Sequence, residues 1–211
     1  MSEIRWRKTD ASDWLQHCPE HESFYLVYGR IYTPGEGYSF SETNNLISNL
    51  KASPQQQQRL RYKRLAMEKF AAEVIDLFTD GLKKTSSLVL VPMPPSKAKD
   101  HPDYDNRIEV VAQRVAEAFE NIVCLPLLVT IESHEGYHTS GASREAEDIY
   151  NSIAVDEEIT GYYSEGSTFV ILDDILTSGA HYAAARRKLL ERFSNTEVKG
   201  LFWAKSQYMD V

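Results

Sequence analysis

Residues 167–181 read STFVILDDILTSGAH and decide the fold class. An apolar run of strand-forming residues ends in two adjacent acids, Asp173 and Asp174. Small hydroxyl residues and a glycine follow, and then a helix-like segment begins. Strands that are apolar on both faces are typical of parallel sheets covered by helices. Ligands in such folds bind beyond the carboxyl ends of the strands, so we expect a binding site where this strand ends.

Strand and helix patterns alternate through the C-terminal two thirds of the chain. The predicted strands are residues 87–95, 121–130, 151–156, 167–174 and 198–206. Apolar residues recur at helical spacing over 108–119 and 182–193, which predicts two amphipathic helices. The sequence therefore predicts an α/β fold whose parallel sheet has helices on both faces.

Residues 1–55 carry a weaker pattern. The segment FYLVYGRIY at 24–32 is aromatic and β-branched, and a PGEG turn follows at 34–37. This combination predicts a short hairpin or edge structure. We expect a small N-terminal appendage of unknown role over residues 1–55, followed by one domain over residues 56–211.

A helix is predicted from the QQQQ run at 55–58 to Gly81, because the apolar residues between them follow a 3.6-residue period. The first half of this helix is basic. Its cationic residues are Arg59, Arg61, Lys63 and Arg64. We interpret them as a solvated face, with a patch facing an anionic ligand or partner as the alternative.

The 211-residue chain has a net charge of −8, which argues against broad, nonspecific nucleic-acid binding. Its N-terminus lacks an apolar leader and no segment is long enough to span a bilayer, so we expect a cytoplasmic location and no membrane partner. Cys124 is predicted to be a buried free thiol. We interpret His17, Cys18 and His21 as loop residues rather than metal ligands.

The segment after the acid pair has the features of a phosphate cradle. Gly179 allows backbone angles that other residues avoid, and Thr177 and Ser178 supply hydroxyl donors. The helix that follows directs its free N–H groups and positive end toward this loop. Carboxylates would repel a phosphate, so Asp173 and Asp174 are expected to bind sugar hydroxyls or a magnesium ion instead.

The run VILDDILTSGA resembles the phosphoribosyl-pyrophosphate (PRPP) motif of type I phosphoribosyltransferases. The resemblance implies that the two acids bind the ribose hydroxyls and Mg²⁺, and that the loop holds the 5′-phosphate. The PRPP-binding residues that it implies are Asp173, Asp174, Thr177, Ser178, Gly179, Ala180 and His181.

Two further segments fit this resemblance. VPMPPSKAKDHPDYDNR at 91–107 stands where the family has its pyrophosphate loop, often with an unusual peptide bond. Ser96, Lys97 and Arg107 would contact pyrophosphate; by itself, the segment also fits an exposed charged loop. Residues 133–151 are similar to the loop that closes over the reactants, in a pattern closest to the ComF-like branch. Arg144 in this loop would bind pyrophosphate, although a plain surface loop is an equal interpretation.

The resemblance implies a magnesium-dependent enzyme in which Asp173, Asp174 and Lys97 act in catalysis. It would transfer phosphoribose from PRPP to a nitrogen acceptor, an unidentified base or amine, and release pyrophosphate. Family members with a hypoxanthine–guanine substrate have an aspartate where this chain has Thr177, so a 6-oxopurine acceptor is not implied. A homodimer is also expected from the family.

Two other functions fit the sequence. The first is a non-catalytic protein of the same fold that binds PRPP or a nucleotide and regulates a partner. The second is a phosphoacceptor domain, because an acid pair at a strand end also holds magnesium in domains of that class. Such domains carry their acids after the first strand, whereas this pair stands at 173–174 and precedes a phosphate-type loop.

Overall fold

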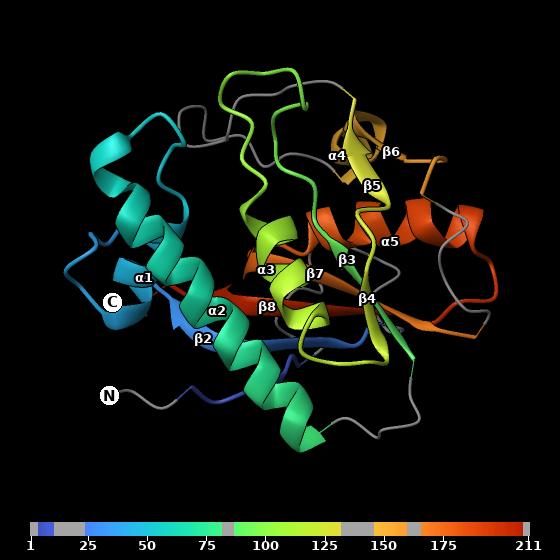
Figure 1. Cartoon of the computed structure of the whole chain (residues 1–211), viewed down its shortest axis with the longest axis horizontal. Helices are drawn as coiled ribbons and strands as arrows, with labels where there is room; N and C mark the ends of the chain where they lie inside the picture. Colours follow the sequence, from blue (N-terminus) through green and yellow to red (C-terminus); the bar gives the residue numbers. More distant parts are fainter. Residues whose placement is uncertain (1–3, 11–23, 82–86, 132–145, 160–165, 209–211) are drawn as a thin grey trace.

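The computed structural model describes residues 4–10, 24–81, 87–131, 146–159 and 166–208. Its main sheet has six strands in the order β1–β2–β8–β7–β3–β4 (Figure 1). These strands are β1 (Arg7–Lys8), β2 (Leu26–Tyr32), β3 (Leu88–Pro92), β4 (Ile122–Cys124), β7 (Thr168–Leu176) and β8 (Val198–Ser206). All neighbouring strands are parallel except β1 and β2.

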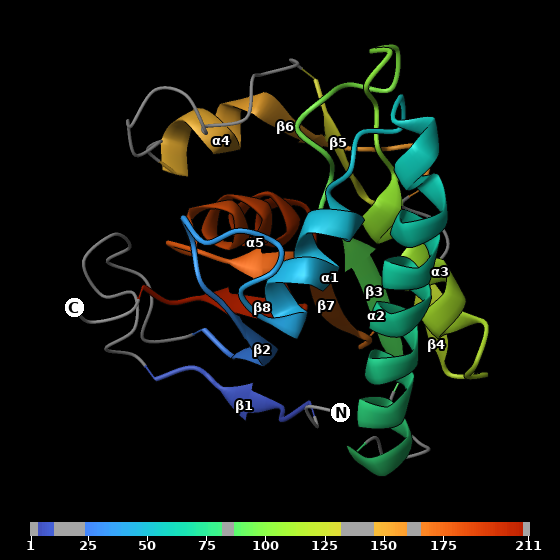
Figure 2. The same cartoon turned by 90° about the vertical axis from the view of Figure 1, so that its left-hand side faces the viewer.

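Helices cover both faces of this sheet, as Figure 2 shows. The helices are α1 (Glu42–Leu50), α2 (Leu60–Gly81), α3 (Arg107–Ala116), α4 (Ala146–Ser152) and α5 (Ala180–Arg192). On one face α1, α2 and α3 pack against the sheet, and on the other α5 does so, with α4 beside it. The predicted α/β fold, a mostly parallel sheet between helices, is therefore confirmed.

The residues of the central strands explain why both faces are covered. In β3, Val89 and Val91 belong to the hydrophobic cluster under α5, whereas Leu88 and Leu90 belong to the cluster under α2 and α3. Successive side chains of a strand point to opposite faces, so an uninterrupted apolar run needs a cover on each side. The same alternation holds in the first part of β7, where Phe169 and Ile171 belong to the first cluster and Val170 and Leu172 to the second.

The predicted strand at 121–130 is wrong as a single element. It divides into β4 in the main sheet and β5 (Leu128–Thr130), which pairs antiparallel with β6 (Ile153–Val155) in a separate two-stranded sheet. Pro126 lies between the two parts and has no N–H to donate to a ladder. Periodicity could not show this break, because both parts are apolar.

The segment 24–32 also pairs differently from the prediction of a hairpin or edge structure. β2 lies inside the sheet and pairs in parallel with β8 from Leu26 to Tyr32. Residues 42–50 form α1, whose Ile47 and Leu50 are buried in the same cluster as α2. The segment 1–55 thus supplies a strand and a helix to the layers described above, and the boundary at residue 55 stays a prediction.

The predicted helix at 55–81 is confirmed in its main part. A short 3₁₀ turn, η3 (Gln57–Arg59), precedes α2, which ends at Gly81 as predicted. The interpretation of its basic residues as a solvated face is wrong for Lys63, which is buried. Among the described helices, none is long and apolar enough to cross a membrane.

Candidate functional site

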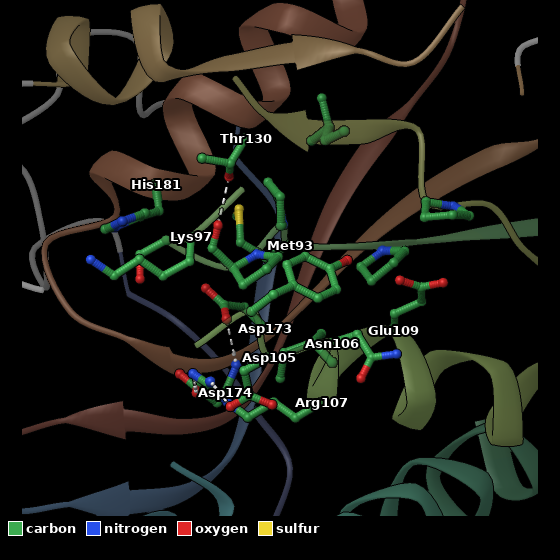
Figure 3. Close-up of a pocket in the computed structure, with 18 of the residues that line it drawn as sticks. Met93, Lys97, Asp105, Asn106, Arg107, Glu109, Thr130, Asp173, Asp174 and His181 are labelled. Atoms are coloured by element: carbon green, nitrogen blue, oxygen red, sulfur yellow. Dashed lines mark hydrogen bonds and ion pairs between the residues drawn. The ribbon is translucent and has the colours of Figure 1, made fainter. Parts of the chain in front are cut away.

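A cavity of about 380 Å³ lies at the carboxyl ends of β3 and β7 (Figure 3). Of the predicted site residues, those that line it are Ser96, Lys97, Arg107, Asp173, Asp174, Thr177 and His181. Ser178, Gly179 and Ala180 form the turn beside the cavity and are not among its lining residues. Arg144 lies outside the described residues, as do His17, Cys18 and His21.

The two sides of the cavity carry different chemistry. Lys97 and His181 lie on one side in Figure 3, and Asn106 and Glu109 lie on the other. The acid pair from β7 forms part of the wall between them. One side therefore suits an anionic group, and the other can accept hydrogen bonds from a neutral or cationic group.

The turn from β7 into α5 has the expected backbone geometry. Gly179 has φ of +80°, in the left-handed region that favours glycine, and α5 begins at the next residue. The Ala180 N–H donates to the Ser178 hydroxyl at 3.4 Å. Thr177 and His181 on either side of the turn line the cavity, so the N-terminal end of α5 faces it.

The acids lie within β7 rather than after it, because the strand continues to Leu176. Asp174 is buried and its carboxylate is held by two cations. Arg107 donates to Asp174 Oδ2 from Nη2 at 2.8 Å and from Nε at 3.2 Å. Lys51 Nζ lies 3.3 Å from the other oxygen, Oδ1.

A second, partly buried carboxylate supports this arrangement by binding two cations. Arg107 Nη1 also donates to Asp105 Oδ2 at 2.7 Å, and Lys63 Nζ lies 2.6 Å from the same oxygen. Lys63 additionally donates to the backbone carbonyls of Leu50 and Ala52, at 2.9 and 2.8 Å. Burial lowers the pKa of Lys63, although Asp105 opposes that change. This lysine therefore connects the end of α1 to the loop that precedes α3, whose first residue is Arg107.

The two acids of the pair have opposite electrostatic environments. Asp173 is half-buried and accepts a hydrogen bond from the Asp174 backbone N–H at 2.8 Å. Burial and the neighbouring charge of Asp174 raise the pKa of Asp173 to about 7. Burial also acts on Asp174, but Lys51 and Arg107 outweigh it and hold its pKa below the ordinary value.

The loop after β3 differs from one expectation. No cis peptide bond occurs in the described residues, so the unusual bond implied by the family resemblance is absent from residues 91–107. The Pro95 carbonyl accepts a hydrogen bond from the Thr130 hydroxyl at 2.6 Å. This contact joins the loop to β5 above the cavity.

A magnesium ion would find one available carboxylate here rather than two. Both oxygens of Asp174 face cations, whereas Asp173 faces the cavity. Within the described part of the chain, no three His, Cys, Asp or Glu side chains are grouped closely enough to hold a metal ion. Mg²⁺ commonly binds one or two carboxylates and completes its shell with ligand phosphates and water. Asp173 fits that mode, and a ligand would have to supply the remaining oxygens.

Two functional residues are absent from the sequence-based prediction. Lys51 contacts Asp174 and lines the cavity, although it comes from the segment 1–55. The sequence predicts a solvated face for Lys63, with a patch facing an anionic ligand or partner as the alternative. A lone lysine at the end of a helix carries no local signal of an ion pair, because its partner stands far away in the sequence. Cys124 is a free thiol, as predicted, but it is half-buried rather than buried, and partial burial raises its pKa to about 12.

No protein-family profile matches the chain, and neither does any curated protein sequence. The solved structures that resemble it include a hypoxanthine phosphoribosyltransferase from Staphylococcus aureus, at 12% sequence identity over 68% of this chain and 74% of that one, with a TM-score of 0.38.

Adenine phosphoribosyltransferase from Leishmania tarentolae is 11% identical over 85% of this chain and 91% of that one, with a TM-score of 0.42. The enzyme from Trypanosoma brucei, solved with AMP, pyrophosphate and ribose 5-phosphate, is 9% identical over 84% and 83%, with a TM-score of 0.40. Scores this low carry no functional weight, so function has to be argued from the chain's own residues.

Proposed function

We propose that this protein is a magnesium-dependent phosphoribosyltransferase that binds PRPP in the cavity at the carboxyl end of β7. The observation that carries the proposal is that one cavity contains the acid pair, the two residues that flank the turn into α5, and Lys97. These are the groups that a sugar bearing a phosphate and a diphosphate requires. Membership of the ComF-like branch is part of this proposal.

Each group has a separate task in the proposed complex. The Asp173 carboxylate accepts hydrogen bonds from the ribose hydroxyls, and Asp174 holds Arg107 in place beside it. The turn at residues 177–181 binds the 5′-phosphate through backbone N–H groups and hydroxyls. Ser96 and Lys97 bind the diphosphate from the loop after β3, with Arg107 and Arg144 as further pyrophosphate contacts.

In the proposed reaction, the bond between ribose C1 and the diphosphate oxygen breaks and a bond from C1 to the acceptor nitrogen forms. The diphosphate leaves with the bonding electron pair, and the nitrogen loses a proton to solvent. Lys97 stabilises the negative charge that grows on the leaving group, and Asp173 orients the ribose as positive charge develops on it. Asp173 and ligand oxygens would hold Mg²⁺, which when bound would supply further charge neutralisation.

A regulatory protein that binds PRPP or a nucleotide without turnover is the alternative. The observation that favours it is the ion pairing of Asp174, because two cations occupy an acid that the family resemblance assigns to the ribose hydroxyls and Mg²⁺. In addition, His181 is the only histidine among the described residues that line the cavity, and it is exposed. In the described part of the chain, the cavity therefore offers no buried histidine that could take the acceptor's proton.

Calorimetric titration of PRPP with Mg²⁺ tests the proposal. We expect saturable binding to the wild-type protein, and affinity at least roughly tenfold weaker in an Asp173→Asn, Asp174→Asn double variant whose folding is verified by circular dichroism. Absence of binding to the folded wild-type protein would rule out both functions. Pyrophosphate release with a panel of nucleobases and amines then separates them, because the regulatory protein would bind without turnover.

A further inference from the structure

The segment before α2 contributes a side chain to the candidate site. Lys51 directly follows α1, and its backbone N–H donates to the carbonyls of Ile47 and Asn49 at the end of that helix. Ile47 and Leu50 are buried against α2. The backbone of Lys51 is thus fixed, whereas its side chain is a flexible four-carbon stem with a compact charge at its end.

The two cations on Asp174 are held very differently. Arg107 uses three of its N–H groups, two on Asp174 and one on Asp105, and its side chain is 20% exposed. Lys51 makes one contact, at 3.3 Å, and its side chain is 37% exposed. Moving Arg107 would break two partly buried ion pairs, but moving Lys51 leaves Asp174 paired with Arg107. Lys51 is therefore the cation that can leave Asp174 and form an ion pair with a ligand instead.

Lys51 also stands where two cavities adjoin. The second cavity, of about 320 Å³, lies between the segment 51–54 and the loop after β3. Lys51, Lys97 and Arg107 line both cavities. Because Lys51 and Lys97 line the same cavities, the flexible Lys51 side chain can reach an anionic group that is bound next to Lys97.

We infer that Lys51 is a further ligand-binding residue, which leaves Asp174 and pairs with the diphosphate group of the ligand. This inference rests on the proposed function. On binding, Lys51 would exchange its ion pair with Asp174 for one with the diphosphate, so its charge has a partner in both states. Asp174 would stay paired with Arg107. It also gives the segment 1–55 a role, because the helix α1 places the lysine at the site.

The chain offers a matched control in Lys69 on α2. Its Nζ lies 3.3 Å from the buried carboxylate of Glu73, and its side chain is 44% exposed. Glu73 is also paired with an arginine, Arg30. Lys69 lines neither cavity described above. The variants Lys51→Met and Lys69→Met therefore remove equivalent ion pairs, and only the first removes a cation from the cavities.

Calorimetry with two separate probes tests the inference: magnesium pyrophosphate and ribose 5-phosphate. We expect Lys51→Met to weaken pyrophosphate binding roughly tenfold and ribose 5-phosphate binding by less than about twofold. Lys51→Arg should retain binding of both probes, and Lys69→Met should leave both affinities at the wild-type level.

Three results would overturn the inference. If Lys51→Met leaves pyrophosphate affinity unchanged, Lys51 does not contact the ligand. If both probes weaken equally, the lysine acts only by holding Asp174. If Lys69→Met weakens pyrophosphate binding as much as Lys51→Met does, the effect is one of stability. A wild-type protein that binds neither probe would instead contradict the proposed function, and the inference would fall with it.

Discussion

Two buried carboxylates on the same side of the sheet are neutralised in nearly the same way. Asp174 and Glu73 each have a side chain that is 6% exposed, and each pairs with one arginine and, at 3.3 Å, with one half-exposed lysine. Their surroundings differ. Asp174 lines the cavity, whereas Glu73 also accepts a hydrogen bond at 2.6 Å from the indole of Trp203, a buried ring that stacks on Phe70.

The comparison shows that a buried ion pair does not by itself mark a functional site. The Glu73 network joins β2, α2 and β8, and its acceptor oxygens face donors from the protein alone. The Asp174 network has the same charges but one side opens into a cavity shared with Asp173 and Lys97. We infer that the first serves stability and the second serves a ligand.

The largest effect on stability is expected for Arg30→Met. This change leaves Glu73 buried with only Lys69 as a cation partner, and breaking a buried pair from one side typically costs about 3–5 kcal/mol. Urea unfolding of the variant and the wild type measures the loss. A loss of unfolding free energy below about 1 kcal/mol would contradict the inference that the Glu73 network stabilises the fold.

Lys63→Met should be the next most destabilising change, by about 2–3 kcal/mol, because two carbonyls and Asp105 lose a charged donor. It should also weaken PRPP binding, since Asp105 helps to fix Arg107. Unfolding and titration of the same sample measure both effects. Loss of stability with unchanged PRPP affinity would separate Lys63 from the site.

Asp173→Asn should change the pH dependence of stability. The pKa of Asp173 is raised in the folded state, so its contribution to stability is complete below the unfolded-state pKa and is lost as pH rises through about 7. Asparagine has no carboxyl group to ionise, so the variant does not lose this contribution to stability as pH rises. We expect it to exceed the wild type in free energy of unfolding by about 1–2 kcal/mol at pH 8, and by much less at pH 5. An equal difference at both pH values would contradict this account.

The smallest effects on stability are expected for Lys51→Met and Lys69→Met. Both lysines are half-exposed, so each change should cost less than about 1 kcal/mol. Differential scanning calorimetry of the two variants measures these costs. A markedly greater loss for Lys51→Met would show that its contact with Asp174 is a structural one, like the pairs made by the arginines.

The central strands and the acid pair were predictable because their signals are local. The runs at 167–172 and 198–206 are apolar on both faces of the strand. Asp173 and Asp174 interrupt the first run, although the strand itself continues to Leu176. The break between β4 and β5 was hidden, because both parts are equally apolar. The cations on Asp174 and Asp105 were hidden for another reason. Lys63 and Asp105, for example, stand 42 positions apart, and only packing brings them together.

Titration of PRPP with Mg²⁺ into Asp174→Asn and Glu73→Gln, side by side, tests the central distinction most directly. Both substitutions neutralise a buried carboxylate and leave its arginine without that partner. We predict wild-type affinity in Glu73→Gln despite its lower stability, and affinity at least roughly tenfold weaker in Asp174→Asn. Equal affinities in the two variants would contradict the assignment of the Asp174 network to ligand binding.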